Sequence, residues 1–214
     1  MQKPKSTLWI TVGAFTAALV LLLLLAGLAI FLLDATRAYT NGESLYTKGQ
    51  KEAVIALQHY AHSRDQRDLD AYHQAIEVPL GDRDARQALE RRPPDLEAAR
   101  RGFLQGGNHP DDIGFMIRLF LWLDDTPVFR PPLHQWREAD AHIVEIQSVA
   151  QELEAAMHGD AGTTAGRDRL LDRLAKLNKL ASDAQAGFSA AVGESARAAR
   201  GAFVLILAAT SLLL

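Results

Sequence analysis

Histidine is the residue type in this sequence best suited to holding a metal ion, and the chain has seven of them. His59 and His62 are three residues apart, so on a helix they would lie one turn apart, and His73 follows nearby. A zinc or iron site also needs carboxylates or a third histidine on a facing helix, and the chain has neither the Glu-x-x-His spacing of di-iron bundles nor His-Glu-x-x-His. We therefore interpret these histidines as solvated or capping residues and predict no metal and no cofactor.

Gly102, Gly106 and Gly107 could form a phosphate-binding loop. Such a loop continues into Gly-Lys-Ser/Thr after a strand, and neither feature is present in the sequence. The glycines are better explained as the end of one helix and the start of the next. The sequence also lacks Gly-x-Ser-x-Gly, so we predict no catalytic residue.

A pocket between helices is the better candidate for a binding site, because aromatic side chains line such pockets and an arginine can donate to an anion in a bidentate fashion. The candidate ligand-binding residues are Asn108, His109, Arg118, Trp122 and Trp136. The first two fall in the segment 102–118, the least regular part of the chain, which we expect near the membrane-distal half of a helical bundle. The alternative is that these residues are ordinary core aromatics and surface arginines.

The composition of the 214 residues is strongly segregated along the chain. Residues 6–33 and 201–214 carry no charged residue or histidine, while 34–200 carries all 26 acidic residues and 21 of the 23 Lys and Arg. Together with the absence of Cys, this pattern excludes a simple soluble globule, a disulfide-stapled mini-domain and a Cys-ligated metal protein. The mildly acidic central region excludes a basic nucleic-acid binder and is long enough for one domain with its own core.

Residues 8–33 are predicted to form a first transmembrane helix, preceded by a cytoplasmic N-terminus at 1–7. A helix of 26 residues is roughly 39 Å long, which exceeds the roughly 30 Å hydrocarbon core of a bilayer. Trp9 and Tyr39 bracket it as interfacial anchors. A cleaved signal peptide is the alternative, but the apolar run is about twice the usual length and no convincing Ala-x-Ala step closes it.

Residues 201–214 are too short to cross a bilayer alone, and we expect them to begin a second transmembrane helix that continues beyond Leu214. A short hairpin or tail anchor is the alternative. The basic residues do not favour one orientation, but long loops translocate largely regardless of charge. We therefore expect residues 34–200 to lie outside, with the seven-residue N-terminus in the cytoplasm.

Strand patterns are nearly absent, and three segments instead carry apolar or small residues at alternating steps of three and four, as helices that pack together do. They are Tyr39, Gly42, Tyr46, Gly49, Ala53, Ala56 and Tyr60; Trp136, Ala139, Ile143, Ile146, Ala150, Leu153 and Met157; and Leu170, Leu174, Leu177, Ala181, Ala184, Phe188, Ala191, Ser195 and Ala198. The last pattern runs into the second uncharged stretch without a proline. We predict an all-α fold, an antiparallel four-helix-type bundle with two transmembrane helices.

The rest of the chain predicts shorter helices that together take the place of the fourth. We expect helices at 66–78, 83–91, 95–105 and about 110–123, with a turn at 80–82 where Pro79 and Gly81 interrupt the pattern. We expect the first span to continue outward as a helix from Asp34 to about His62, although Asn41-Gly42 could instead mark a turn near the membrane surface. Gly159 should end the long helix that follows Pro131-Pro132.

This arrangement resembles the input half of bacterial transmembrane receptors, and several phrases resemble the sensory region of GGDEF/EAL cyclases and phosphodiesterases and of sensor histidine kinases. The phrases lie at 41–54, 78–86, 102–113 and 188–194. The resemblance covers nearly all of 34–200 and implies a periplasmic sensor domain at the bacterial inner membrane and a cytoplasmic output, either c-di-GMP turnover or a two-component kinase, outside these residues. We also expect a homodimer, because the seams of the membrane-connected helices must be covered and one chain supplies few long helices.

The resulting hypothesis is a signal-input module, not an enzyme, that responds to a small molecule or a protein and binds no nucleic acid. The residues expected to transmit the signal along the last helix are Ala184, Phe188, Ala191 and Ser195. The main alternative is a membrane-anchored tether that binds a protein partner. A bundle metalloenzyme and a sensor of membrane lipid or stress are further alternatives.

Overall fold

The structure, a computed structural model, describes residues 4–158 and 164–212, and these residues form six α-helices and no strand. The helices are α1 (Pro4–Ser63), α2 (Gln66–Glu90), α3 (Leu96–Gln105), α4 (Pro110–Leu123), α5 (Arg130–His158) and α6 (Thr164–Leu212). The all-α prediction is therefore confirmed. Gly159, the residue expected to end α5, lies outside the described residues.

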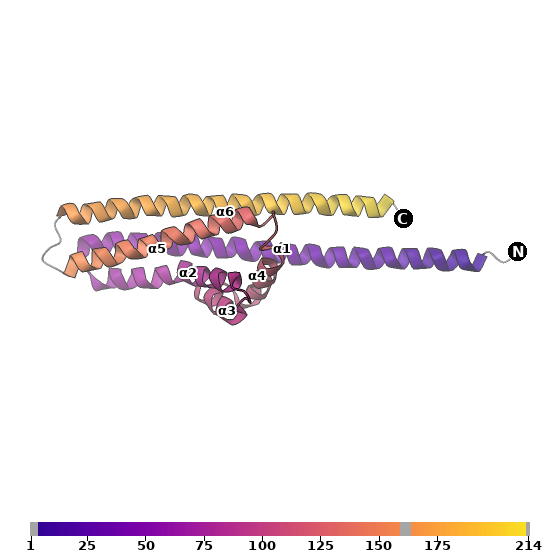
Figure 1. Ribbon diagram of the computed structural model, residues 1–214, viewed down its shortest axis with the longest axis horizontal. Coiled ribbons are helices and arrows are strands. Elements are labelled where there is room, and N and C mark those ends of the chain that lie inside the picture. The colour runs from indigo at the N-terminus through magenta and orange to yellow at the C-terminus, as the bar shows by residue number, and fades with distance from the viewer. Residues whose placement is uncertain (1–3, 159–163, 213–214) are drawn as a thin grey trace.

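Four long helices, α1, α2, α5 and α6, run lengthwise beside one another, while α3 and α4 pack at one end of this group (Figure 1). Beyond that end, α1 and α6 continue side by side, and both chain termini lie on that side. The fourth place in the bundle thus belongs to α2 rather than to a series of short helices. Arg64, with a left-handed φ of 56°, lies in the two-residue turn that reverses the chain between α1 and α2.

The three seams of apolar and small residues are buried where the helices pair. Every predicted seam residue of α1 and of α5 is buried, and so are the α6 seam residues from Leu174 to Phe188. Beyond Phe188 the α6 seam becomes partly exposed at Ala191 and Ser195 and fully exposed at Ala198. The periodicity therefore located the buried faces correctly, and the bundle ends where the α6 seam loses its cover.

The prediction of two short helices with a turn at 80–82 is wrong, because α2 continues through Pro79 and Gly81 as one helix of 25 residues. A proline inside a helix removes a hydrogen bond and crowds the preceding turn. Here that turn packs against the backbone of α1 at Gly49, where a methyl group would lie 2.9 Å from the Ala75 carbonyl oxygen and 3.2 Å from Pro79 Cδ. Tertiary packing thus holds the helix together at the point where the local sequence favours a break.

Gly81 has the same role on another face of α2, where it allows the backbone of α3 to approach. A methyl group at Gly81 would lie 2.6 Å from the Gly102 carbonyl oxygen, and one at Gly102 would lie 2.5 Å from the Gly81 carbonyl oxygen. Glycine is needed here for space and not for a turn, since Gly81 is helical. The two glycines therefore set how closely α3 packs on α2.

Two further expectations concern where segments lie relative to the membrane. A turn at Asn41-Gly42 does not occur, because α1 is helical without a break from Pro4 to Ser63. The segment 102–118, expected near the membrane-distal half, lies at the end of the bundle from which the apolar stretch of α1 extends, which is the membrane-proximal end if 8–33 is the span. It packs on α1 next to the apolar stretch, where the Phe31 and Phe115 rings are 5.8 Å apart and the Tyr39 hydroxyl donates to the Met116 carbonyl at 3.0 Å.

Within the described residues, one helix is long and apolar enough to cross a membrane. It is α1, whose apolar window has a mean hydropathy of 2.9 and is not buried by the rest of the protein. Large side chains there, such as Trp9 and Ile10, are more than 70% exposed. Its length, composition and place near the N-terminus match those of a membrane span and of a signal sequence. The second span expected from 201 onward is not confirmed.

Replacing Gly81 with Ala should lower the free energy of unfolding by about 1–3 kcal/mol, because the added methyl group overlaps backbone atoms that cannot move without separating α2 from α3. Thermal unfolding followed by circular dichroism in detergent measures the change. The matched control is Gly114→Ala in α4, where the nearest atom to the new methyl group is Arg118 Nη2 at 3.8 Å and the change should be neutral or slightly stabilising. Equal melting of both variants would contradict the packing argument.

Candidate functional site

The core consists of two apolar clusters, and a group of polar side chains lies where they meet. One cluster fills the half of the bundle near the α1–α2 turn, and the other fills the half that contains α3 and α4. We call the group at their boundary the polar cluster, and its members are Tyr46, Asp82, Arg86, Asn108 and Asp140, all of them buried. Buried polar and charged groups are destabilising unless they are paired, so the contacts within this cluster are needed to offset the free-energy cost of burying its members.

Asp140 on α5 is the centre of the polar cluster. Its Oδ2 accepts a hydrogen bond from Arg86 Nε on α2 at 2.7 Å, and its Oδ1 accepts one from the Tyr46 hydroxyl on α1 at 3.1 Å. Three of the four long helices therefore meet at one carboxylate. Its side chain is 3% exposed and that of Arg86 is 6% exposed, which makes this a fully buried ion pair.

Asp82 forms the other half of the polar cluster, between α2 and the α3–α4 connection. Its Oδ1 accepts a hydrogen bond from Asn108 Nδ2 at 2.8 Å, and the same amide also donates to the Phe103 carbonyl at 3.1 Å. The carboxylate lies directly against Gly106, where a side chain would collide with it. Asn108 in turn lies against Gly42 of α1, so that a methyl group there would be 2.7 Å from its Oδ1. One asparagine thus fills the junction of α1, α2 and the α3–α4 connection.

Burial shifts the titration of both carboxyl groups of the polar cluster. It raises the pKa of Asp82 well above the usual range against the opposing effect of the Asn108 hydrogen bond, and the nearby charge of Asp140 raises it further. Burial also raises the pKa of Asp140, to about 6, although Arg86 and Tyr46 act in the opposite direction. The pKa of the Tyr46 hydroxyl is raised by burial and by Asp140. Both carboxyl groups of the cluster therefore hold a proton at higher pH than exposed carboxyl groups do.

Beside the polar cluster lies a group of buried rings, which we call the aromatic cluster: Tyr39, Phe103, Phe120, Phe129, Trp136 and Phe188. Trp136 is its hub, with ring centroids 6.0 Å from those of Tyr39 and Phe188, both in edge-to-face geometry, and 6.4 Å from that of Phe103. A small cavity of about 20 Å³ lies between the two clusters and is lined by residues of both, including Asp82 and Trp136. That volume holds about one water molecule.

The predicted ligand-binding residues do not gather in one pocket. Asn108 belongs to the polar cluster and Trp136 to the aromatic cluster, so these two do lie close together around the small cavity. His109 instead caps the N-terminus of α4, where its Nδ1 accepts a hydrogen bond from the Asp111 backbone N–H at 3.3 Å, and its side chain is 65% exposed.

Arg118 and Trp122 lie on another face of α4, toward the apolar stretch of α1. Trp122 is 59% exposed, and its ring is 4.8 Å from that of Phe31. The guanidinium carbon of Arg118 lies 5.2 Å from the centroid of the Phe115 ring and 5.8 Å from that of Phe31, both cation–π contacts. These two residues attach α4 to α1 instead of facing the cavity.

The four residues expected to transmit a signal differ in their surroundings. Ala184 and Phe188 are buried, and Phe188 contacts Trp136 in the aromatic cluster. Ala191 and Ser195 are partly exposed. The Ser195 hydroxyl donates to the Val128 carbonyl at 2.9 Å, which connects α6 to the turn between α4 and α5.

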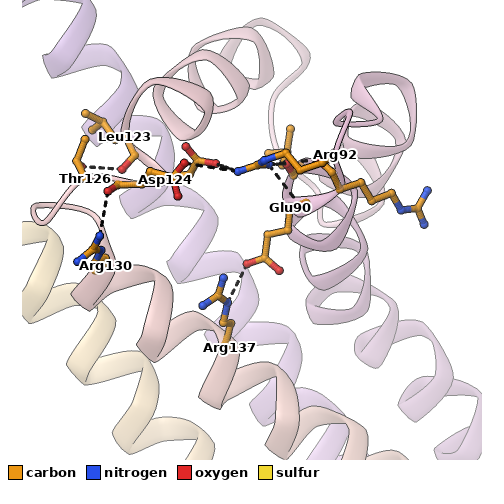
Figure 2. Close-up of polar contacts among 10 residues, drawn as sticks. Glu90, Arg92, Leu123, Asp124, Thr126, Arg130 and Arg137 are labelled. Atoms are coloured by element: carbon orange, nitrogen blue, oxygen red, sulfur yellow. Dashed lines mark hydrogen bonds and ion pairs between the residues drawn. The ribbon is translucent and has the colours of Figure 1, made fainter.

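A second set of ionic contacts extends the polar cluster toward the surface (Figure 2). Arg86 also donates to Glu90 at 2.7 Å, and the other oxygen of Glu90 accepts from Arg137 Nε at 2.9 Å. Beyond the end of α2, Arg92 donates to Asp124 at 2.6 Å, as Figure 2 shows. The polar contacts therefore run from the centre of the bundle to the turn that leads into α5.

Sequence reasoning missed Asp82, Arg86 and Asp140. These residues lie in polar stretches whose composition indicates a solvated helix surface. Their burial depends on helices that are distant in the sequence. One usable signal was present, because Asp140 immediately follows the seam residue Ala139 and so borders the buried face of α5.

The arrangement can bind and release protons and can rearrange its ion pairs, but it does not place a nucleophile next to a base. Among the residues that the structure describes, no group of three or more His, Asp or Glu side chains could hold a metal ion. Comparisons with protein-family models, with curated proteins and with solved structures found no match.

Replacing Asp82 with Asn should stabilise the protein progressively as the pH rises. An acid whose pKa is raised by folding binds its proton more tightly in the folded state, so its contribution to stability is lost as the pH rises from about 4 through the folded pKa. Asn keeps an acceptor for Asn108 and never ionises. We expect the variant to exceed the wild type by about 1–3 kcal/mol at pH 8 and to differ little at pH 4.

Thermal unfolding across this pH range measures the difference between Asp82→Asn and the wild type. Asp84→Asn, at an exposed carboxylate on the same helix, is the control and should give a small difference that does not grow with pH. Parallel stability curves for Asp82→Asn and the wild type would show that Asp82 is not a folding-linked titrating group.

Replacing Arg86 with Met should destabilise the protein by about 3 kcal/mol at pH 8, because Asp140 then keeps its buried charge without its partner. The loss should shrink at pH 5, where Asp140 can take up a proton. The control is Arg91→Met, which breaks the exposed ion pair with Asp95 just after the end of α2. This change should lower the free energy of unfolding by roughly 0.5 kcal/mol or less. Chemical denaturation at both pH values tests this, and a loss independent of pH would contradict it.

Proposed function

We propose that this protein is the membrane-anchored input module of a bacterial transmembrane signalling receptor. In this proposal the bundle lies outside the inner membrane, and a stimulus changes its packing. The last helix then carries the change to a cytoplasmic output of the c-di-GMP or histidine-kinase type. Support comes from the four sequence phrases at 41–54, 78–86, 102–113 and 188–194 and from the course of α6.

The observation that carries the proposal is the continuity of α6. It is one helix of 49 residues, with its buried seam in the bundle core and its last residues in the second uncharged stretch. A helix of that length is roughly 70 Å long and has no proline at which it could bend sharply. A displacement of the buried half must therefore move the other half as well.

The proposed anchor is the first part of α1, with residues 8–33 as the membrane span. Exposed large apolar side chains cover this part of the helix, which a bilayer would solvate and water would not. The part of α6 from 201 to 212 extends beyond the bundle on the same side as this span and antiparallel to it (Figure 1). We propose it as the beginning of a second span, and a homodimer as the arrangement that covers the exposed faces of these rods.

The proposed point of coupling is the contact of α6 with the aromatic cluster through Phe188. Gln50 of α1 adds a second link, because its fully buried amide donates to the Asn178 side chain at 3.0 Å and to the Ser182 hydroxyl at 3.2 Å on α6. Close-packed interfaces of this kind switch between discrete arrangements and do not deform continuously. A change in the adjacent polar cluster would thus reach α6 as a shift of the whole helix.

Replacing Phe188 with Asp should change the distance between α1 and α6 near the membrane, because a buried charge at the aromatic cluster repositions α6. The chain has no native cysteine, so spin labels can be placed at Ile30→Cys and Leu205→Cys only, and dilution of labelled chains with unlabelled ones confines the signal to the distance within one protomer. Both positions are more than 60% exposed. In the full chain reconstituted in nanodiscs, we expect electron–electron double resonance to show a shift of about 1–2 Å or more.

Ser189→Asp is the matched control, since it adds the same charge at the next, exposed position and should leave the distance unchanged. If Phe188→Asp loses helical content, the overpacking variant Ala184→Leu repeats the test at a second buried seam position. Distance distributions identical to the wild type in folded variants would favour a passive tether and contradict transmission through α6.

A further inference from the structure

An apolar groove of about 480 Å³ lies between α1 and α6 where the two helices leave the bundle. Its walls are one face of α1, from Ala29 to Thr36, and one face of α6, from Val192 to Phe203. The end of α4 and the turn into α5 close it toward the bundle, through Leu119, Leu123, Val128 and Phe129. The groove adjoins the small cavity beside the polar cluster at Tyr39, the one residue that lines both.

The position of the groove coincides with the boundary of the uncharged segments. On α1 it extends across Leu33 and Asp34, where the uncharged stretch ends, and on α6 it extends across Arg200 and Gly201, where the second stretch begins. If α1 is anchored as proposed above, this boundary is the surface of the bilayer. The groove would then open to a region filled with lipid acyl chains and headgroups.

The lining of the groove combines an apolar floor with two positive charges. The charged residues that line it are Arg197 and Arg200, three residues apart and therefore on the same side of α6. Within the described part of the chain, neither arginine forms an ion pair with a carboxylate, so both are available to an anionic ligand. Guanidinium groups bind phosphate through paired hydrogen bonds, so the groove complements a molecule with an apolar chain and an anionic phosphate.

We propose that this groove binds one anionic phospholipid of the surrounding bilayer, with an acyl chain against Leu32 and Phe203 and the phosphate against Arg197 and Arg200. The volume lies within the range of sites for small amphiphilic ligands. A bound lipid would contact α1 and α6 at once and would fill the space between the two helices that the bundle leaves open. The lipid would thereby fix their spacing at the membrane surface.

Native mass spectrometry of the full chain, reconstituted in vesicles of phosphatidylcholine and phosphatidylglycerol at a 3:1 ratio and released in mild detergent, tests the proposal. We expect the wild type to retain one phosphatidylglycerol, enriched over its share of the vesicle. Arg197→Gln/Arg200→Gln should reduce the retained phosphatidylglycerol about tenfold. The matched control, Arg169→Gln/Lys176→Gln, removes two positive charges from the opposite end of α6 and should retain the lipid like the wild type.

Ala199→Phe provides an independent test, because it fills the groove and leaves both arginines in place. We expect it to abolish lipid retention while the protein stays folded. Retention in proportion to the vesicle composition, or equal loss in the arginine variant and its control, would overturn the proposal. A wild type without lipid whose oligomeric mass changes in Ala199→Phe would also overturn it, since the groove would then be an interface between copies of this chain.

The inference rests on the membrane anchoring proposed for α1, and vesicle flotation separates the two. Failure of the anchor leaves the protein out of the floated fraction. Failure of the lipid site leaves it in that fraction with no enriched lipid. Signal transmission through α6 is tested by the spin-label distance and does not enter either result.

Discussion

Asp140 is a carboxylate placed inside the core of a narrow helical bundle, and the packing around it has to satisfy that charge. Arg86 on α2 and Tyr46 on α1 do so from two sides, which fixes the register of three long helices against one another. Such a pair adds little net stability, because removing two charges from water offsets most of their attraction. Its main effect is to disfavour any other register, since a shift of one turn would leave a buried charge without a partner.

The location of α3 and α4 follows from contacts that begin at this polar cluster. Asn108 connects Asp82 to the α3–α4 connection, and the close approach of Gly81 and Gly102 brings α3 onto α2. The aromatic cluster around Trp136 then fills the space between α1, α3, α5 and α6. Together these contacts keep the irregular segment at the end of the bundle next to the apolar part of α1, where a membrane would lie.

The same geometry explains why the proposed function and the proposed lipid site involve α1 and α6. These two helices extend beyond the core, and the α6 seam is no longer buried by the other helices after Phe188. The groove begins where that burial ends, so its contents and the packing of Phe188 act on neighbouring turns of α6. In the proposed function, a change in the aromatic cluster and occupation of the groove would both act on this part of α6.

The sequence by itself determined the helical class, the buried faces of α1, α5 and α6, and the two uncharged stretches, because heptad spacing and the absence of charge are local properties. It also singled out Asn108 and Trp136, which do lie at the candidate site. Only the tertiary structure decided that α2 passes through Pro79 and Gly81 without a break. Gly49 of α1 and Gly102 of α3, both distant in sequence, leave room for that stretch to pack closely against them. The tertiary structure alone brought Asp82, Arg86 and Asp140 out of polar stretches into the core, because burial depends on neighbours that are distant in sequence and that no local pattern reveals.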